Sequence, residues 1–192
     1  TALSEHALRL KDGGWSTQPD RIAILRKHLR GKGSAAITAS AAVDFGPVDL
    51  PGPTGEANTL TLPARGVAVC LGPDGDTLLA QSIQALAAGC RVVAAAPGAA
   101  AALNALTGKG LPIAAIDGTV DPELLEKAPC DVVAFAGEAD PMRAIRQALA
   151  SRSGAIVPLI SEVIYPAAYA HERAVCVDTT AAGGNASLLA AA

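Results

Sequence analysis

The stretch Gly66–Pro97, GVAVCLGPDGDTLLAQSIQALAAGCRVVAAAP, predicts the fold of the chain around it. It begins with a short apolar run, Val67 to Leu71, and ends with a second one, Val92 to Ala96. Between them a glycine-rich turn leads into a segment whose apolar residues recur every three or four positions, as on one helix face. Two wholly apolar strands joined by a helix are typical of neighbouring parallel strands in a buried sheet. We therefore expect a βαβ unit, with Asp76 as the helix cap.

The same alternation of strands and helices continues toward the C-terminus. Three further apolar runs predict strands at Ile113–Ile116, Val132–Ala136 and Ile156–Ile160. The segments between the strands predict helices at Ala99–Leu106, after Asp121, and at Ala139–Ala150. This order predicts an α/β fold with a doubly wound parallel sheet.

The flanking segments differ from this regular pattern. Two helices, Ala2–Leu10 and Asp20–Arg30, are expected before the sheet. A connection rich in proline and glycine then leads to a half-exposed strand at Thr59–Leu62, and an exposed strand is expected at Ala174–Thr179. The chain begins at Thr1, inside a helical pattern and without an initiator methionine, so we expect a piece of a longer protein.

Composition excludes several classes of function. With 15 basic and 18 acidic residues the chain lacks the positive excess of a general nucleic-acid binder. No apolar run approaches the roughly 20 residues that a membrane-spanning helix needs. The four cysteines form no CxxC pair and have no histidine at metal-ligand spacing, so no metal site is expected. We interpret them as buried free thiols of a cytoplasmic protein.

One face of the helix expected at Asp20–Arg30 carries Arg21, Arg26, Lys27 and Arg30. These side chains form either an anion-binding patch or an ordinary solvated helix face. Charged helix faces are common, which favours the second interpretation.

The turn after the first apolar run is the place where a doubly wound sheet would hold a nucleotide. Gly72 and Gly75 are the candidate cofactor-binding residues there, but the turn lacks the G-x-G-x-x-G spacing. Asp74 and Asp76 also place two carboxylates where a pyrophosphate would lie. The residues therefore predict no bound cofactor.

No group of residues predicts catalysis either. Each cysteine lacks a nearby base in the sequence. His171, Glu172 and Glu162 are expected near the C-terminal segment, where such a cluster is typical of a surface ion pair. We accordingly predict no catalytic residue.

Two stretches resemble a known family. LPGPTGEANTLTLPARGVAVCLGP (50–73) with ALAAGCRVVAAAP (85–97), and HERAVCVDTTAAGGNASLL (171–189), are similar to the C-terminal region of long-form proline utilisation A. That family comprises bacterial bifunctional flavoproteins that oxidise proline to glutamate. The resemblance implies a Rossmann-like domain, similar to the cofactor domain of aldehyde dehydrogenases but without activity of its own.

The resemblance also implies three parts: N-terminal helices (1–42), the Rossmann-like domain (43–170), and a flap strand with a C-terminal tail (171–192). Where aldehyde dehydrogenases have Pro-Trp-Asn in the first turn, this chain has Pro73-Asp74-Gly75. Their Lys-Pro pair is replaced by Ala96-Pro97, and their Glu-Leu-Gly-Gly by Leu159-Ile160-Ser161-Glu162. The resemblance therefore implies FAD and NAD in the parent enzyme and neither in this chain.

The partners implied by the resemblance are the aldehyde dehydrogenase and proline dehydrogenase domains of the same parent chain. In the family, extended strands of this region pair with a projecting segment of the aldehyde dehydrogenase domain. The tail helps to close a tunnel that carries pyrroline-5-carboxylate between the two active sites. The matching tail residues are Thr179, Thr180, Gly183, Gly184, Asn185 and Ser187. A homo-oligomer is left open.

Two alternatives compete with a structural domain. The first is a vestigial NAD-binding module that senses the cofactor despite Asp74 and Ala96. The second is an independent small α/β enzyme, which would need a reactive thiol among Cys70, Cys90, Cys130 and Cys176.

Overall fold

The computed structural model describes residues 2–178, and in this range it contains a five-stranded and a three-stranded sheet. The larger sheet is wholly parallel and has the strand order β5-β4-β3-β6-β7. Its strands are β3 (Val67–Cys70), β4 (Arg91–Ala96), β5 (Ile113–Asp117), β6 (Val132–Ala134) and β7 (Leu159–Ile160). The chain winds outward from β3 to β5, returns, and winds the other way through β6 and β7. The predicted doubly wound, Rossmann-like fold is confirmed.

Helices cover both faces of this sheet. One face packs against α2 (Arg21–Leu29), α3 (Ser34–Ala41), α4 (Gly75–Ala88) and α5 (Ala99–Ala102). The other packs against α1 (Ala2–Arg9), the 3-10 helix η1 (Pro122–Glu126) and α6 (Ala139–Ala150). Successive strand residues point to opposite faces, so Ala68 and Cys70 join the first core while Val67 and Val69 join the second. Burial on both faces explains why β3 is apolar throughout and why β4 is apolar after Arg91.

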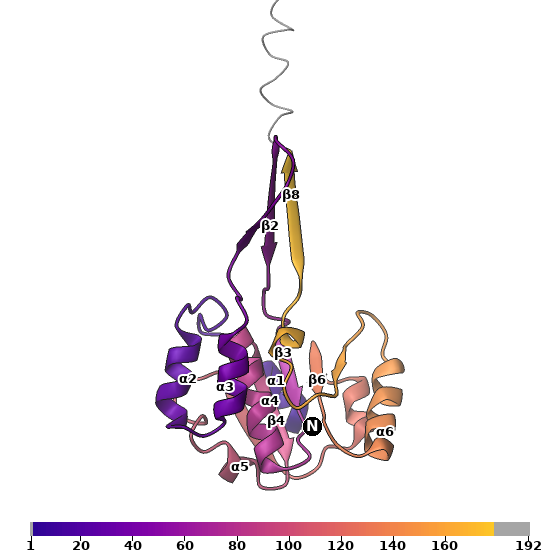
Figure 1. Cartoon of the computed structure of the whole chain (residues 1–192). Helices are drawn as coiled ribbons and strands as arrows, with labels where there is room; N and C mark the ends of the chain where they lie inside the picture. Colours follow the sequence, from indigo (N-terminus) through magenta and orange to yellow (C-terminus); the bar gives the residue numbers. More distant parts are fainter. Residues whose placement is uncertain (1, 179–192) are drawn as a thin grey trace, which may run out of the picture.

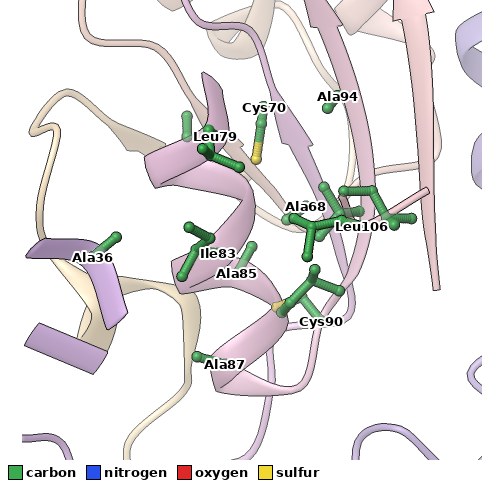
Figure 2. Close-up of a cluster of buried hydrophobic side chains, with 14 of the residues drawn as sticks. Ala36, Ala68, Cys70, Leu79, Ile83, Ala85, Ala87, Cys90, Ala94 and Leu106 are labelled. Carbon is green, nitrogen blue, oxygen red and sulfur yellow. The ribbon is translucent and has the colours of Figure 1, made fainter. Parts of the chain in front are cut away.

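Helix α4 is the centre of the first core. Ten of its residues are buried, and Figure 2 shows Leu79 of this helix beside Cys70 of the sheet and Ile83 on the side of the helix toward Ala36 of α3. Trp15 donates a hydrogen bond from Nε1 to the carbonyl oxygen of Leu86 (2.9 Å), which ties the N-terminal segment to the same helix. The N-terminal helices thus share a hydrophobic core with the sheet.

The cap of α4 differs from the prediction. Asp74, not Asp76, is the N-cap: its backbone is extended and its carboxylate accepts a hydrogen bond from the backbone N–H of Thr77. Asp76 lies inside the first turn of the helix. A side chain accepts from the N–H three residues ahead only when its own backbone is still extended, so the earlier aspartate is the cap.

Other elements also differ from the prediction, and the strand predicted at Val132–Ala136 ends at Ala134. The helix predicted at Ala99–Leu106 ends at Ala102, because the segment that follows closes in tight turns in which Leu106 N–H donates to Leu103 O. The strand predicted at Ile156–Ile160 is reduced to Leu159–Ile160 by Pro158, which has no N–H, and Ile156 is 93% exposed. Helix α3 was missed because its sequence, SAAITASA, consists mainly of small residues without a helical apolar period.

The second sheet projects away from the α/β body (Figure 1). It consists of β1 (Val48–Leu50), β2 (Glu56–Thr61) and β8 (Arg173–Asp178), all antiparallel and in the order β1-β2-β8. We call these three strands the flap. The strand predicted at Thr59–Leu62 spans Glu56–Thr61 as β2. The strand predicted at Ala174–Thr179 spans Arg173–Asp178 as β8, and Thr179 lies outside the described residues. The second 3-10 helix, η2 (Pro166–Tyr169), precedes β8 in the chain.

Candidate functional site

The first place to look for a ligand is the carboxyl edge of the parallel sheet. Doubly wound sheets bind ligands where the strand order reverses, outside the carboxyl ends of the strands. Here β3 lies between β4 and β6, so the turn after β3, Gly72 to Asp76, lies at that position. Its residues decide whether a phosphate group can be held.

Gly72 is fully occupied by hydrogen bonds within the protein. Its N–H donates to Oε1 of Gln81 (3.1 Å), and its carbonyl oxygen accepts from Nε2 of the same side chain (3.2 Å). Ala136 N–H donates to that carbonyl as well (3.2 Å). Gln81 is 0% exposed, so this amide is a fixed part of the core. The N–H of Gly72 is therefore not free to bind a phosphate oxygen.

Replacing Gln81 by leucine tests this clamp. The variant keeps the volume of the side chain but leaves the buried N–H of Gly72 without a partner, at a cost of about 1–3 kcal/mol in unfolding free energy. Urea unfolding measures the loss. Gln147→Leu on α6 is the matched control, because Gln147 is exposed, and it should change the unfolding free energy by less than about 0.5 kcal/mol. Equal effects of the two variants would contradict the assigned role.

Gly75 and Asp74 also have structural roles. A Cβ atom on Gly75 would lie 3.2 Å from the Cβ of Ala102, so glycine allows α4 and α5 to approach closely. The carboxylate of Asp74 accepts from Thr77 N–H (2.8 Å) and Thr77 Oγ1 (3.0 Å), and these hydrogen bonds lower the pKa of Asp74. The aspartate thus occupies the helix N-terminus, where a phosphate would otherwise bind.

Asp74→Ala should destabilise the fold by about 1 kcal/mol at pH 7 through loss of the cap. Because the folded state lowers the pKa of this carboxyl below its ordinary value of 3.8, the stabilisation is complete above that value. It is lost as the pH falls through the lower pKa of the folded protein. Chemical unfolding between pH 7 and pH 2 should therefore show the two proteins converging only below about pH 3.8. Asp76→Ala, which removes no cap, should cost less at pH 7.

A hollow of about 320 Å³ lies beside this turn at the same edge of the sheet. Its walls are almost entirely apolar, and they include Leu71, Ala96, Pro97, Val120, Phe135 and Ile145. Thr119 is the one polar side chain in the wall. Such a hollow has room for a small flat group, but it offers no charged partner for a phosphate or a ribose.

The cysteines do not supply an activated nucleophile. Burial raises the pKa of the Cys90 thiol to about 11, and it also raises the pKa of Cys70 and Cys130. The expectation that all four thiols are buried was wrong for Cys176, which is exposed on β8. Its pKa is raised by local desolvation and by the carboxylates of Glu56 and Asp178. A raised pKa disfavours the reactive thiolate at neutral pH.

The charged residues before β8 do not gather as an ion pair. His171 Nδ1 lies 3.3 Å from Arg65 Nη1, and Glu162 accepts a hydrogen bond from the N–H of Ser161. Within residues 2–178 no ion pair joins His171, Glu162 and Glu172. In the same range no set of three metal-binding side chains converges, and no helix has the length and apolarity to span a membrane.

The flap is the second candidate site. All six residues of β8 are exposed, with Val175 at 45% and Val177 at 51%. In the pairing register, Val175 and Val177 share one face of the sheet with Thr59 and Ala57. Cys176 lies on the opposite face of β8. Neither face of this strand is covered by the rest of the described chain, and β8 is an edge strand. The predicted tail residues Thr179, Thr180, Gly183, Gly184, Asn185 and Ser187 lie outside the described residues.

Sequence relatives decide the family. No family model matches the chain. It is 38% identical over 148 residues to the bifunctional protein PutA of Salmonella typhimurium, and 37% identical over 148 residues to that of Escherichia coli. This chain is homologous to part of PutA. The alignments cover 73% of the chain and 11% of each relative, so it spans about a tenth of the length of the curated PutA proteins it matches.

Solved PutA structures contain a region with a fold similar to that of this chain. PutA from Bdellovibrio bacteriovorus matches with a TM-score of 0.71 at 16% identity, over 82% of this chain and 22% of that one. A PutA structure with proline bound in remote sites matches with a TM-score of 0.66 at 27% identity, over 84% and 21%. An NAD-dependent benzaldehyde dehydrogenase from Corynebacterium glutamicum shares the fold (TM-score 0.50, 16% identity, 82% and 41%). The predicted resemblance to proline utilisation A is confirmed, as is the aldehyde-dehydrogenase-like fold.

Proposed function

We propose that the chain is a non-catalytic structural domain of a bifunctional, proline-catabolic oxidoreductase of the PutA type. In this proposal the flap docks on the aldehyde dehydrogenase domain of the same parent protein and helps to close a channel between two active sites. The observation that carries the proposal is the uncovered flap. A three-stranded antiparallel sheet gains its stability by burying at least one face, and β8 buries neither within the described chain.

The open edge of β8 suits a docking role. An exposed edge strand presents unpaired N–H and carbonyl groups that another strand can bind. Val175 and Val177 add apolar surface on the adjoining face. Backbone pairing along the edge and burial of these two valines are the contacts that we assign to the partner domain.

The absence of catalysis in this chain is part of the same proposal. Gln81 binds Gly72, Asp74 caps α4, and burial raises the pKa values of Cys70 and Cys90. These features support a carboxyl edge used for structure. We assign FAD and NAD to other parts of the parent protein, which we place in the cytoplasm. Thr179 to Ser187 are proposed to extend the docking surface toward the channel.

Two measurements test the proposal. The chain and the aldehyde dehydrogenase domain of the protein that carries it, expressed as separate polypeptides, should sediment together as a 1:1 complex in analytical ultracentrifugation. The chain alone should oxidise neither proline nor an aldehyde substrate with NAD. Independent sedimentation of the two polypeptides, or turnover by the chain alone, would contradict the proposal.

Removing Gly183 to Ala192 from the full-length protein tests the tail. If the tail closes the channel, the intermediate escapes into solvent in the truncated protein, and NADH forms from proline only after a lag. A coupled assay followed at 340 nm measures that lag. A time course without a lag would leave the tail with no part in channelling.

One observation favours the alternative of an NAD-sensing module: the apolar hollow of about 320 Å³ beside the Gly72 turn. An NMR titration with NAD⁺ into the millimolar range separates the two functions. A structural domain shows no saturable shifts. Saturable changes in the chemical shifts of Phe135 and Val120, in the wall of the hollow, would favour the NAD-sensing function over the structural one.

A further inference from the structure

A second, larger hollow of about 540 Å³ lies between the end of α2 and the turn that follows α5. Its walls carry five basic side chains, which we call the basic cluster: Lys27, His28, Arg30, Lys32 and Lys109. Asn104 adds an amide, and no acidic side chain lines the hollow. This concentration of positive charge is unexpected on a chain whose net charge is −3.

Two distant segments build the cluster. Four of its members lie in the last turn of α2 or just after it, where buried Leu25 and Leu29 fix the helix against the core. Lys109 comes from the opposite wall, beyond α5, in a segment anchored by buried Leu106. The negative end of the α2 dipole accounts for basic residues on α2 itself. It does not account for Lys109, which α2 does not contain.

The structure separates the arginines of the predicted patch. Arg21 is half-buried and donates from Nε to the carbonyl oxygen of Ala87 (2.8 Å) and from Nη1 to that of Gln18 (2.7 Å), so it is a structural residue. Arg26 does not line the hollow, whereas Lys27 and Arg30 do. The feature is therefore a concave site between two segments, not a uniformly charged helix face.

The positive charges in the cluster are not balanced within the protein. None of its five side chains forms an ion pair with any residue in the described range 2–178. Several cations around one hollow repel one another, and this repulsion is relieved when an anion binds between them. Lysine, arginine and histidine also provide the charge-assisted hydrogen bonds that phosphate oxygens accept most strongly.

We propose that the basic cluster binds a small molecule that carries two or more phosphate groups. The concave shape and the limited volume favour a small polyanion over an extended one. The acidic net charge and the lack of a phenylalanine, tyrosine or tryptophan side chain in the walls argue against nucleic acid. One wall of the site follows α5, and Figure 1 shows α5 at the end of the body opposite to the flap, so the test is independent of docking.

Isothermal titration calorimetry of the 192-residue chain with sodium tripolyphosphate tests the proposal. The titration is made in about 150 mM NaCl, where exposed charges more than about 8 Å apart are largely screened. The wild-type chain should bind one tripolyphosphate. The double variant Lys32→Ala/Lys109→Ala should bind it at least about tenfold more weakly, because one charge is lost from each wall.

Arg146→Glu is the control, since it changes the net charge by the same two units at an exposed position of α6. Its affinity should stay within about twofold of the wild type. Lys32 and Lys109 are exposed, so the double variant should fold, and circular dichroism checks this for each variant. Equal weakening in the double variant and the control would show nonspecific attraction and overturn the proposal, as would the absence of saturable binding.

Three further titrations identify the class of ligand. ADP that binds more tightly than inorganic pyrophosphate assigns the site to a nucleotide, and the reverse order assigns it to a free polyphosphate. Both results support a phosphate site. A glutamate-rich peptide that displaces tripolyphosphate at lower concentration than ADP or pyrophosphate would overturn the small-molecule assignment in favour of an acidic protein segment.

Discussion

Replacing Val175 and Val177 of β8 by aspartate lowers the affinity of the chain for the aldehyde dehydrogenase domain by at least about 100-fold. Both side chains are half-exposed on the same face of the flap. If that face becomes buried on docking, two carboxylates must lose their hydration without a partner, which costs several kcal/mol. Biolayer interferometry with the immobilised aldehyde dehydrogenase domain measures the change.

The same variant should unfold at the temperature of the wild-type chain, because neither valine belongs to the two cores of the parallel sheet. Ile156→Asp provides the matched control. Ile156 is 93% exposed outside the flap, so the same chemical change there should leave docking within about twofold of the wild type. Unchanged affinity of the double variant would remove the flap face from the proposed interface.

Leu86→Ala is expected to lower the unfolding free energy by about 3–5 kcal/mol, which is a large part of the stability of a domain of this size. Leu86 is 0% exposed on α4 and belongs to the core between that helix and the sheet. Truncation removes its apolar contacts and leaves a cavity that a sheet of small side chains cannot easily fill. Urea unfolding followed by circular dichroism measures the loss.

Leu8→Ala is the control for this prediction. Leu8 lies on α1 but is 74% exposed, so the same truncation should cost less than about 0.5 kcal/mol. A loss below about 1 kcal/mol for Leu86→Ala would mean that α4 is not packed against the sheet as described.

The parts of the fold that could be predicted are those whose pattern is local. The stretch Gly66–Pro97 shows both strands and the helix between them because each strand is buried on two faces. Helix α3 gave no such signal, since its small residues pack without an apolar period. The pairing of β2 with β8 joins the first third of the chain to its end, and no local pattern encodes that register.

The candidate sites were likewise predictable where their residues are close in the sequence, and not where distant residues come together. The two carboxylates in the turn after β3 predicted a poor phosphate site from the sequence alone. The clamp of Gln81 on Gly72 was missed, although a glutamine three residues after Leu78, within the apolar stripe, is a signal for it. The basic cluster was only partly visible, because Lys109 reaches the hollow from a segment far from α2 in the sequence.

Because β8 follows every other described strand in the sequence, the flap is the second of the two sheets to be completed during synthesis. A ribosome delivers the chain from the N-terminus at about 5–20 residues per second, so β1 and β2 emerge well before β8. Every strand of the parallel sheet is complete before β8 is synthesised, which lets the α/β body fold first. Among the described elements the flap is finished last, so newly made chains gain the proposed docking surface only after the body that supports it can fold.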